Sequence, residues 1–93
     1  MELWIRTQDK LKLVKVNYVY AMKNKINSFS IYGETVDSAP IIGRYETKER
    51  AIEVLDEIQD KMLNGAFAKK INGLGEELDL IPNPILIYNM PER

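Results

Sequence analysis

The chain has 93 residues, with 13 basic and 14 acidic side chains, a formal net charge of −1, and neither cysteine nor histidine. This composition excludes disulfides, thiolate zinc sites, Cys–His nucleophiles and Ser–His triads. The balanced charge also lacks the basic excess of a nucleic-acid-binding domain. A chain of this length makes one domain with a small core. We therefore expect a single domain spanning residues 1–93 that gains further burial by forming a homo-oligomer.

No apolar run approaches the ~20 residues that a membrane-spanning helix needs. The amino-terminal residues Met1–Arg6 do not show the basic stretch followed by an apolar run that marks a secretion signal. The absence of cysteine suits a reducing compartment. We expect a cytoplasmic protein that makes no membrane contact.

Alternation of apolar and polar residues with a period of two predicts strands in the first half of the chain. The first strand covers Leu3–Thr7, and a longer one covers Leu13–Met22 with its two tyrosines on the same face as Val16. Asn24 is expected in a left-handed conformation within a hairpin turn. The remaining predicted segments are the turn Lys23–Lys25, the strand Ile26–Tyr32, the loop Gly33–Pro40 and the strand Ile41–Tyr45 with Gly43 at a bulge or a close approach.

One amphipathic helix is predicted over Thr47–Leu63. Thr47 is a good N-cap, and Asn64–Gly65 supplies a C-terminal stop. Acidic residues occupy the side opposite the apolar stripe. That stripe consists of Ala51, Ile52, Val54, Leu55, Ile58, Met62 and Leu63.

The last third of the chain is less regular. Gly and Pro interrupt the segment Ala66–Asn83, within which we expect a short helix around Glu76–Leu80, and Ile85–Tyr88 is predicted as a final strand. Strands followed by a helix indicate an α+β fold. We expect a mostly antiparallel sheet of about five strands, with the helix packed on one face.

Three stretches of the chain resemble a family of small proteins encoded by phages and prophages of Gram-positive bacteria. They read WIRTQDK at residues 4–10, GRYETKERAIEVLDEIQ at residues 43–59 and YNMPE at residues 88–92. The resemblance implies a phage context and a location in the cytoplasm of the host cell. It implies no particular activity.

Small phage proteins of this size often counteract host defence, and one class sequesters nucleotide second messengers without cleaving them. Such proteins are usually homo-oligomers with pockets between subunits. By this analogy of context and size, we expect a non-enzymatic counter-defence protein that binds and retains a nucleotide-derived signalling molecule.

Aromatic and cationic side chains supply the best candidate ligand-binding residues. An aromatic ring can stack on a base, and an arginine can bind a phosphate with two parallel hydrogen bonds. Trp4 and Arg6 share a strand face because side chains two residues apart point the same way. The alternative is that the aromatics pack the sheet and the arginines form surface ion pairs. The candidate residues are Trp4, Arg6, Arg44, Tyr45 and Tyr88.

Other groups of residues are weaker candidates for a functional site. The acidic helix face, with Glu53, Asp56, Glu57 and Asp60, could bind a metal or imitate nucleic acid, but a solvated face is the simpler interpretation. The run Glu76–Asp79 lacks the spacing of a calcium loop, and Gly73–Gly75 is better explained as a turn than as a phosphate loop. We expect no catalytic residue, metal or cofactor. The alternative function is a protein-binding module that regulates a host or phage protein through the acidic face or through Ala66–Ile81.

Overall fold

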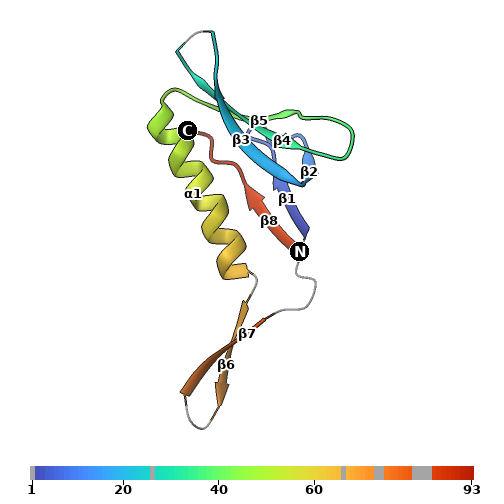
Figure 1. Cartoon of the computed structure of the whole chain (residues 1–93), viewed down its shortest axis with the longest axis vertical. Helices are drawn as coiled ribbons and strands as arrows, with labels where there is room; N and C mark the ends of the chain where they lie inside the picture. The colour runs from blue at the N-terminus through green and yellow to red at the C-terminus, as the bar shows by residue number, and fades with distance from the viewer. Residues whose placement is uncertain (1, 26, 66, 73–74, 81–84) are drawn as a thin grey trace.

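The computed structural model describes residues 2–25, 27–65, 67–72, 75–80 and 85–93 (Figure 1). These residues form strands and one helix, so the predicted α+β class is confirmed. The elements in chain order are β1 (Glu2–Arg6), β2 (Leu13–Val16), β3 (Tyr18–Lys23), β4 (Phe29–Glu34), β5 (Ile41–Tyr45), α1 (Lys48–Gly65), β6 (Phe67–Asn72), β7 (Gly75–Leu80) and β8 (Ile85–Asn89).

The strands are divided between two three-stranded sheets and one hairpin, instead of the one sheet of about five strands that was expected. The first sheet has the order β2-β1-β8, in which β1 is antiparallel to β2 and parallel to β8. The second is antiparallel with the order β3-β4-β5. The parallel pair brings Leu3 beside Leu86, so the two ends of the chain meet in one sheet.

The predicted long strand Leu13–Met22 is broken at Asn17, where the chain passes from the first sheet to the second. The backbone N–H of Asn17 donates to the carbonyl of Glu34 (2.8 Å). The alternation changes phase at this corner. Val16 is buried, but Val19 now packs against the core and Tyr18 is 57% exposed. The expectation that the tyrosines share the face of Val16 was therefore wrong.

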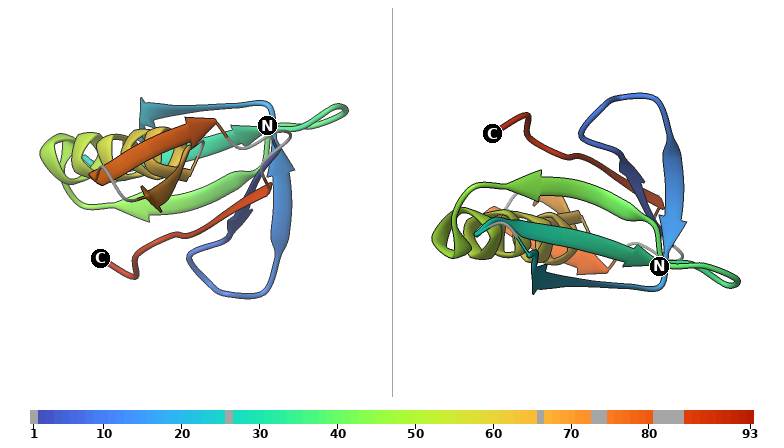
Figure 2. Two further views of the ribbon diagram at one scale, coloured as in Figure 1. Left: turned by 90° about the horizontal axis from the view of Figure 1, so that it is seen from below. Right: turned by 90° about the horizontal axis from the view of Figure 1, so that it is seen from above.

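Helix α1 packs along β3, β4 and β5 and also contacts β8 (Figure 2). Its cap is the predicted one, because the hydroxyl of Thr47 accepts a hydrogen bond from the backbone N–H of Arg50 (3.1 Å). Ile52 and Leu63 from the predicted stripe are exposed instead of buried. The core combines this helix with both sheets and consists of Leu3, Ile5, Val16, Ile31, Ile42, Tyr45, Ala51, Val54, Ile58, Leu86 and Met90. Of the described residues, none belongs to a helix long and apolar enough to cross a membrane.

The β3–β4 connection and the two strand glycines differ in detail from prediction. The positive backbone φ belongs to Asn27 (38°), whereas the Asn24 side chain accepts a hydrogen bond from the buried hydroxyl of Ser30 (2.8 Å). Gly33 lies inside β4 and not in the following loop. The β4–β5 register shifts beside Gly43, where an added Cβ would lie only 2.9 Å from Met90 Cε. The predicted start of β4 at Ile26 lies outside the described residues.

The segment after α1 is a hairpin. The short helix expected at Glu76–Leu80 was wrong, because β7 pairs antiparallel with β6, from Phe67 beside Leu80 to Asn72 beside Gly75. A local pattern does not reveal the pairing partner that stabilises a strand. The hairpin projects from the end of α1, away from the two sheets (Figure 1). Part of the predicted Gly73–Gly75 turn lies outside the described residues.

Candidate anion-binding pocket

A pocket of about 630 Å³ lies where β5 leads into α1. Its volume falls within the range of roughly 300–1,000 Å³ that is usual for small-molecule sites. Three segments form it: the end of β5, the first turn of α1 and the last residues of the chain. The lining residues are Arg44, Tyr45, Glu46, Thr47, Arg50, Glu92 and Arg93.

Two hydrogen bonds and one ion pair hold the carboxy-terminal residues at this pocket. The Tyr45 hydroxyl donates to the carbonyl of Pro91 (2.8 Å), and Arg50 Nε donates to the carbonyl of Arg93 (2.8 Å). Lys10 Nζ lies 2.6 Å from the carboxylate of Glu92. The wall contributed by the chain end is therefore fixed by the body of the domain.

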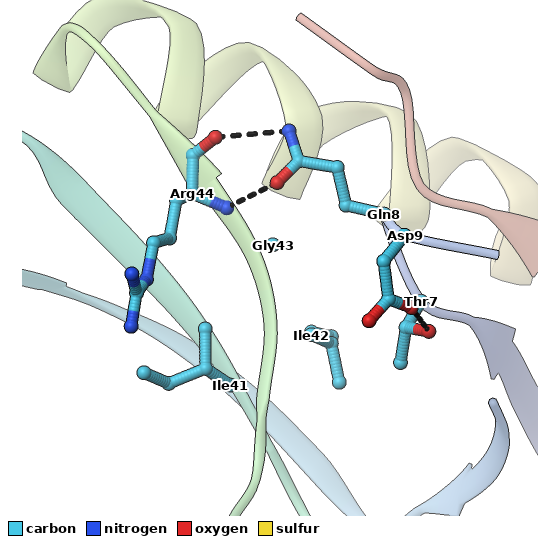
Figure 3. Close-up of a pocket in the computed structure, with 7 residues that line it drawn as sticks. All are labelled: Thr7, Gln8, Asp9, Ile41, Ile42, Gly43 and Arg44. Atoms are coloured by element: carbon cyan, nitrogen blue, oxygen red, sulfur yellow. Dashed lines mark hydrogen bonds between the residues drawn. The ribbon is translucent and has the colours of Figure 1, made fainter. Parts of the chain in front are cut away.

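The Gln8 side chain joins the chain end to the outer edge of β5. Its Oε1 accepts from the backbone N–H of Arg44 (2.7 Å), and its Nε2 donates to the carbonyl of the same residue (2.9 Å) (Figure 3). The backbone N–H of Gln8 also donates to the carbonyl of Ile42 (2.9 Å). Gln8 thus takes the place of a neighbouring strand, and its Nε2 reaches the carbonyls of Pro91 (3.3 Å) and Glu92 (2.9 Å) as well.

A second pocket of about 340 Å³ lies beside Gln8 (Figure 3). Thr7, Asp9 and Ile41 contribute to its walls, and Arg44 lines both pockets. The Thr7 hydroxyl donates to Asp9 Oδ1 (2.6 Å), and this hydrogen bond lowers the pKa of the Asp9 carboxyl. Arg44 is exposed, and its side chain extends away from Gln8, on the side of β5 where Ile41 lies (Figure 3).

The lining of the larger pocket carries a positive balance. It has three arginines against the two carboxylates of Glu46 and Glu92. The Glu92 carboxylate is paired with Lys10, whose hydrogen bond and charge lower its pKa, and Arg50 is likewise paired with Glu53 and Glu57 outside the lining. The first turn of α1 adds backbone N–H groups and the positive end of the helix dipole. The pocket is therefore suited to an anion.

Arg50 connects this pocket to the acidic face of α1. Its guanidinium carbon lies 5.9 Å from the centre of the Tyr45 ring, and its Nη1 lies 3.2 Å from Glu53 and 3.6 Å from Glu57. Two carboxylates of the acidic face are thus ion-paired with an arginine. Within the described part of the chain, no group of three or more acidic residues is placed to hold a metal ion.

The two predicted tyrosines are hydrogen-bond donors that face the protein. Tyr45 is 3% exposed, and burial raises its pKa to about 12. The Tyr88 hydroxyl donates to Glu57 Oε2 (2.6 Å), and burial together with this hydrogen bond raises its pKa. Both phenols are therefore neutral at physiological pH. The buried Tyr45 ring has no free face on which a base could stack.

Trp4 and Arg6 lie elsewhere, on the outward side of β1. Trp4 Nε1 donates to Glu2 (3.3 Å), which also pairs with Lys15 (3.2 Å), and Arg6 Nη1 donates to the carbonyl of Lys10 (3.3 Å). Neither residue lines the larger pocket. Among the candidates predicted from sequence, the fold therefore brings Arg44 and Tyr45 together, with Tyr88 joined to them through Glu57 and Arg50.

Sequence reasoning did not single out Arg50, Arg93 or Gln8. Arg50 lies three residues after the N-cap, so its position near the start of the helix was available as a signal. Arg93 and Gln8 reach the site only through tertiary structure. No family model matches the chain, and no curated protein or solved structure shows significant similarity to it.

Proposed function

We propose that this protein binds a nucleotide-derived signalling molecule through its phosphates, in the pocket at the start of α1, and retains it unchanged. The observation that carries the proposal is that three arginines, Arg44, Arg50 and Arg93, line one pocket of about 630 Å³. Guanidinium groups bind phosphate oxygens in bidentate geometry, and the N-terminus of a helix adds to that preference. In a phage-encoded protein, such retention would remove a host defence signal.

The phosphates, and not the base, would supply most of the recognition. Tyr45 is buried, and Trp4 lies on another face, so no aromatic side chain predicted from sequence offers a stacking surface in the pocket. Selectivity for a nucleotide would then depend on the spacing of its phosphates relative to the arginines. Compounds with two or more phosphates are expected to bind more tightly than those with one.

The titratable groups in and beside the pocket support retention of the ligand without cleavage. The phenols of Tyr45 and Tyr88 have raised pKa values, which makes them poor bases near neutral pH. Glu57 accepts a hydrogen bond from Tyr88 and is ion-paired with Arg50. These groups stabilise the pocket walls and support binding in preference to acid–base catalysis.

Isothermal titration calorimetry with cyclic dinucleotides, ADP-ribose compounds and inorganic pyrophosphate tests the proposal. At least one nucleotide should bind, and chromatography of the released ligand should recover it unaltered. Arg44→Ala should weaken binding by roughly 10- to 100-fold, as expected for the loss of one charge-assisted contact.

Lys23→Ala is the matched control, because Lys23 is an exposed cation at the end of β3 that does not line the pocket. It should leave the affinity unchanged. The absence of binding by every nucleotide at millimolar concentration, or an equal loss in both variants, would contradict the proposal. Turnover of a ligand would show that the protein is an enzyme.

A second candidate function is that of a protein-binding module. The outward side of the β2-β1-β8 sheet supports it, since Ile87, the register partner of Trp4, is 52% exposed and Ile85, the partner of Glu2, is 67% exposed. Such an apolar patch on a small domain is typical of an interaction surface. A stoichiometric complex with one host protein, lost in Ile87→Lys, would support this alternative, and a complex unaffected by that change would contradict it.

A further inference from the structure

The outward side of the β3-β4-β5 sheet carries a cluster of exposed aromatic and aliphatic side chains. Alternate residues of β3, such as Val19 and Ala21, pack against the core, so the intervening ones point away from it. Tyr18 is 57%, Met22 54% and Ile41 37% exposed. We use the term tyrosine face for the surface formed by Tyr18, Tyr20, Met22, Tyr32 and Ile41.

The tyrosine rings are stacked on one another. Tyr20 and Tyr32 are direct partners in the β3–β4 register, with ring centres 5.3 Å apart and an interplanar angle of 11°. Tyr18 and Tyr20 are also 5.3 Å apart, at 35°. The facing sides of these rings are already covered, so the surface differs from the open platforms on which bases stack. A row of rigid aromatic side chains is better suited to a protein partner.

Opposite charges lie at the two ends of the tyrosine face. Glu34 is beside Tyr18 in the register, and Arg44 is beside Ser30, the neighbour of Met22. Four residues along β4 separate these ends, a distance of about 13 Å. Both charged residues are exposed, and neither forms an ion pair with another described residue.

This charge pattern is complementary to itself. Consider two copies whose tyrosine faces lie against each other, related by a two-fold axis in the interface that runs perpendicular to the strands. This rotation places the Glu34 end of one copy over the Arg44 end of the other. The tyrosines of the two copies then meet in the middle. Isologous interfaces have this property, since each patch contacts the same patch of its partner.

We propose that the tyrosine face binds the tyrosine face of a second copy of this chain, in a two-fold symmetric, face-to-face dimer. The apolar centre supplies the contact area, and the two Glu34–Arg44 pairs fix the orientation. Helix α1 occupies the opposite side of the same sheet, so the outward side is open to this contact.

Sedimentation equilibrium of the full chain over a range of concentrations tests the dimer. Wild type should show a monomer–dimer equilibrium, and Tyr20→Lys should raise the dissociation constant by about 30-fold or more, as for a central aromatic contact. Leu11→Lys is the control. It introduces the same charge at an apolar residue that is 80% exposed and lies outside the tyrosine face. It should leave the dimer intact.

Charge exchange provides a test that does not depend on the aromatic residues. Glu34→Arg and Arg44→Glu should each weaken the dimer, and the double variant should restore it, because the pairs re-form with reversed polarity. Circular dichroism establishes that each variant is folded. Failure of the double variant to recover, a wild type that stays monomeric, or equal effects of Tyr20→Lys and Leu11→Lys would each overturn the proposal.

The dimer and the nucleotide pocket both use Arg44 but are tested by separate experiments. The sedimentation experiment measures mass without any ligand, so a protein that binds no nucleotide can still confirm the dimer. A monomer whose binding to single-stranded oligonucleotides is lost in Tyr20→Lys would assign the tyrosine face to nucleic acid and overturn the dimer.

Discussion

Replacing Gln8 with alanine should destabilise the domain more than any other single change at a partly exposed polar residue. The change removes four hydrogen-bonded contacts: the two N–H groups of Nε2 are shared among the carbonyls of Arg44, Pro91 and Glu92, and Oε1 accepts from the Arg44 N–H. Water can reach these backbone groups afterwards, so each bond contributes about 0.5 kcal/mol, the low end for hydrogen bonds in proteins. The free energy of unfolding should fall by about 2 kcal/mol.

Urea denaturation followed by circular dichroism measures this loss. For a domain of this length, a loss of that size lowers the melting temperature by about 10 °C. Gln59→Ala is the matched control, because Gln59 is exposed on α1. It should change the free energy of unfolding by less than about 0.5 kcal/mol. A similarly small effect of Gln8→Ala would refute the idea that Gln8 fastens the chain end to β5.

Gln8→Glu separates the donor from the acceptor. The carboxylate keeps an acceptor for the Arg44 N–H but faces three carbonyl oxygens, so the pKa of this new carboxyl should be raised in the folded state. Stability is then greatest below the ordinary glutamate value of about 4.3 and falls as the pH rises through the folded-state pKa. Gln8→Glu should therefore be less stable than Gln8→Ala at neutral pH, and the difference should shrink in acid.

Three further predictions concern the core. Gly33→Ala should lower the free energy of unfolding by roughly 1–3 kcal/mol, because the new Cβ would lie 2.7 Å from Val16 Cγ1. The double variant with Val16→Ala relieves this contact, so its loss in urea denaturation should be smaller than the sum of the two single losses. Ser30→Ala should lower the free energy of unfolding by about 1 kcal/mol in the same assay, because the Asn24 side-chain oxygen loses the 2.8 Å hydrogen bond from Ser30. Tyr45 should ionise late in a spectrophotometric titration. Its folded pKa of about 12 exceeds the ordinary 10.0, so the stability it contributes is complete below pH 10 and is lost as the pH rises towards 12. Titration of all tyrosines near pH 10 in the folded protein would contradict that environment.

Local patterns predicted those parts of the fold that local interactions determine. Thr47 caps α1 as expected, and the helix ends at Gly65, because a capping hydroxyl and a terminal glycine act within one turn. The strand Ile41–Tyr45 was predicted with its observed bounds. Its alternation continues except at the register shift beside Gly43, for which a bulge or close approach had been expected.

Features that depend on distant partners were not predictable in the same way. The turn at Asn17 is stabilised by Glu34, and β7 is a strand because β6 lies beside it. The pocket also depends on contacts between residues that are far apart in the sequence. Arg93 enters it because Gln8 and Tyr45 bind the preceding carbonyl groups, and no spacing rule within the sequence joins those positions.

The parallel pairing of β1 with β8 has a consequence for how the chain acquires its structure. Leu3 and Ile5 are inward-facing core residues of β1, yet one neighbour of that strand, β8, is synthesised only after β2 to β7. Contacts between residues so far apart in sequence close a long loop and slow folding. A nascent chain that stops before Ile85 leaves that side of β1 without its parallel neighbour. Folding of the β2-β1-β8 sheet should therefore wait until β8 has been synthesised, while the hairpins of the second sheet can form earlier.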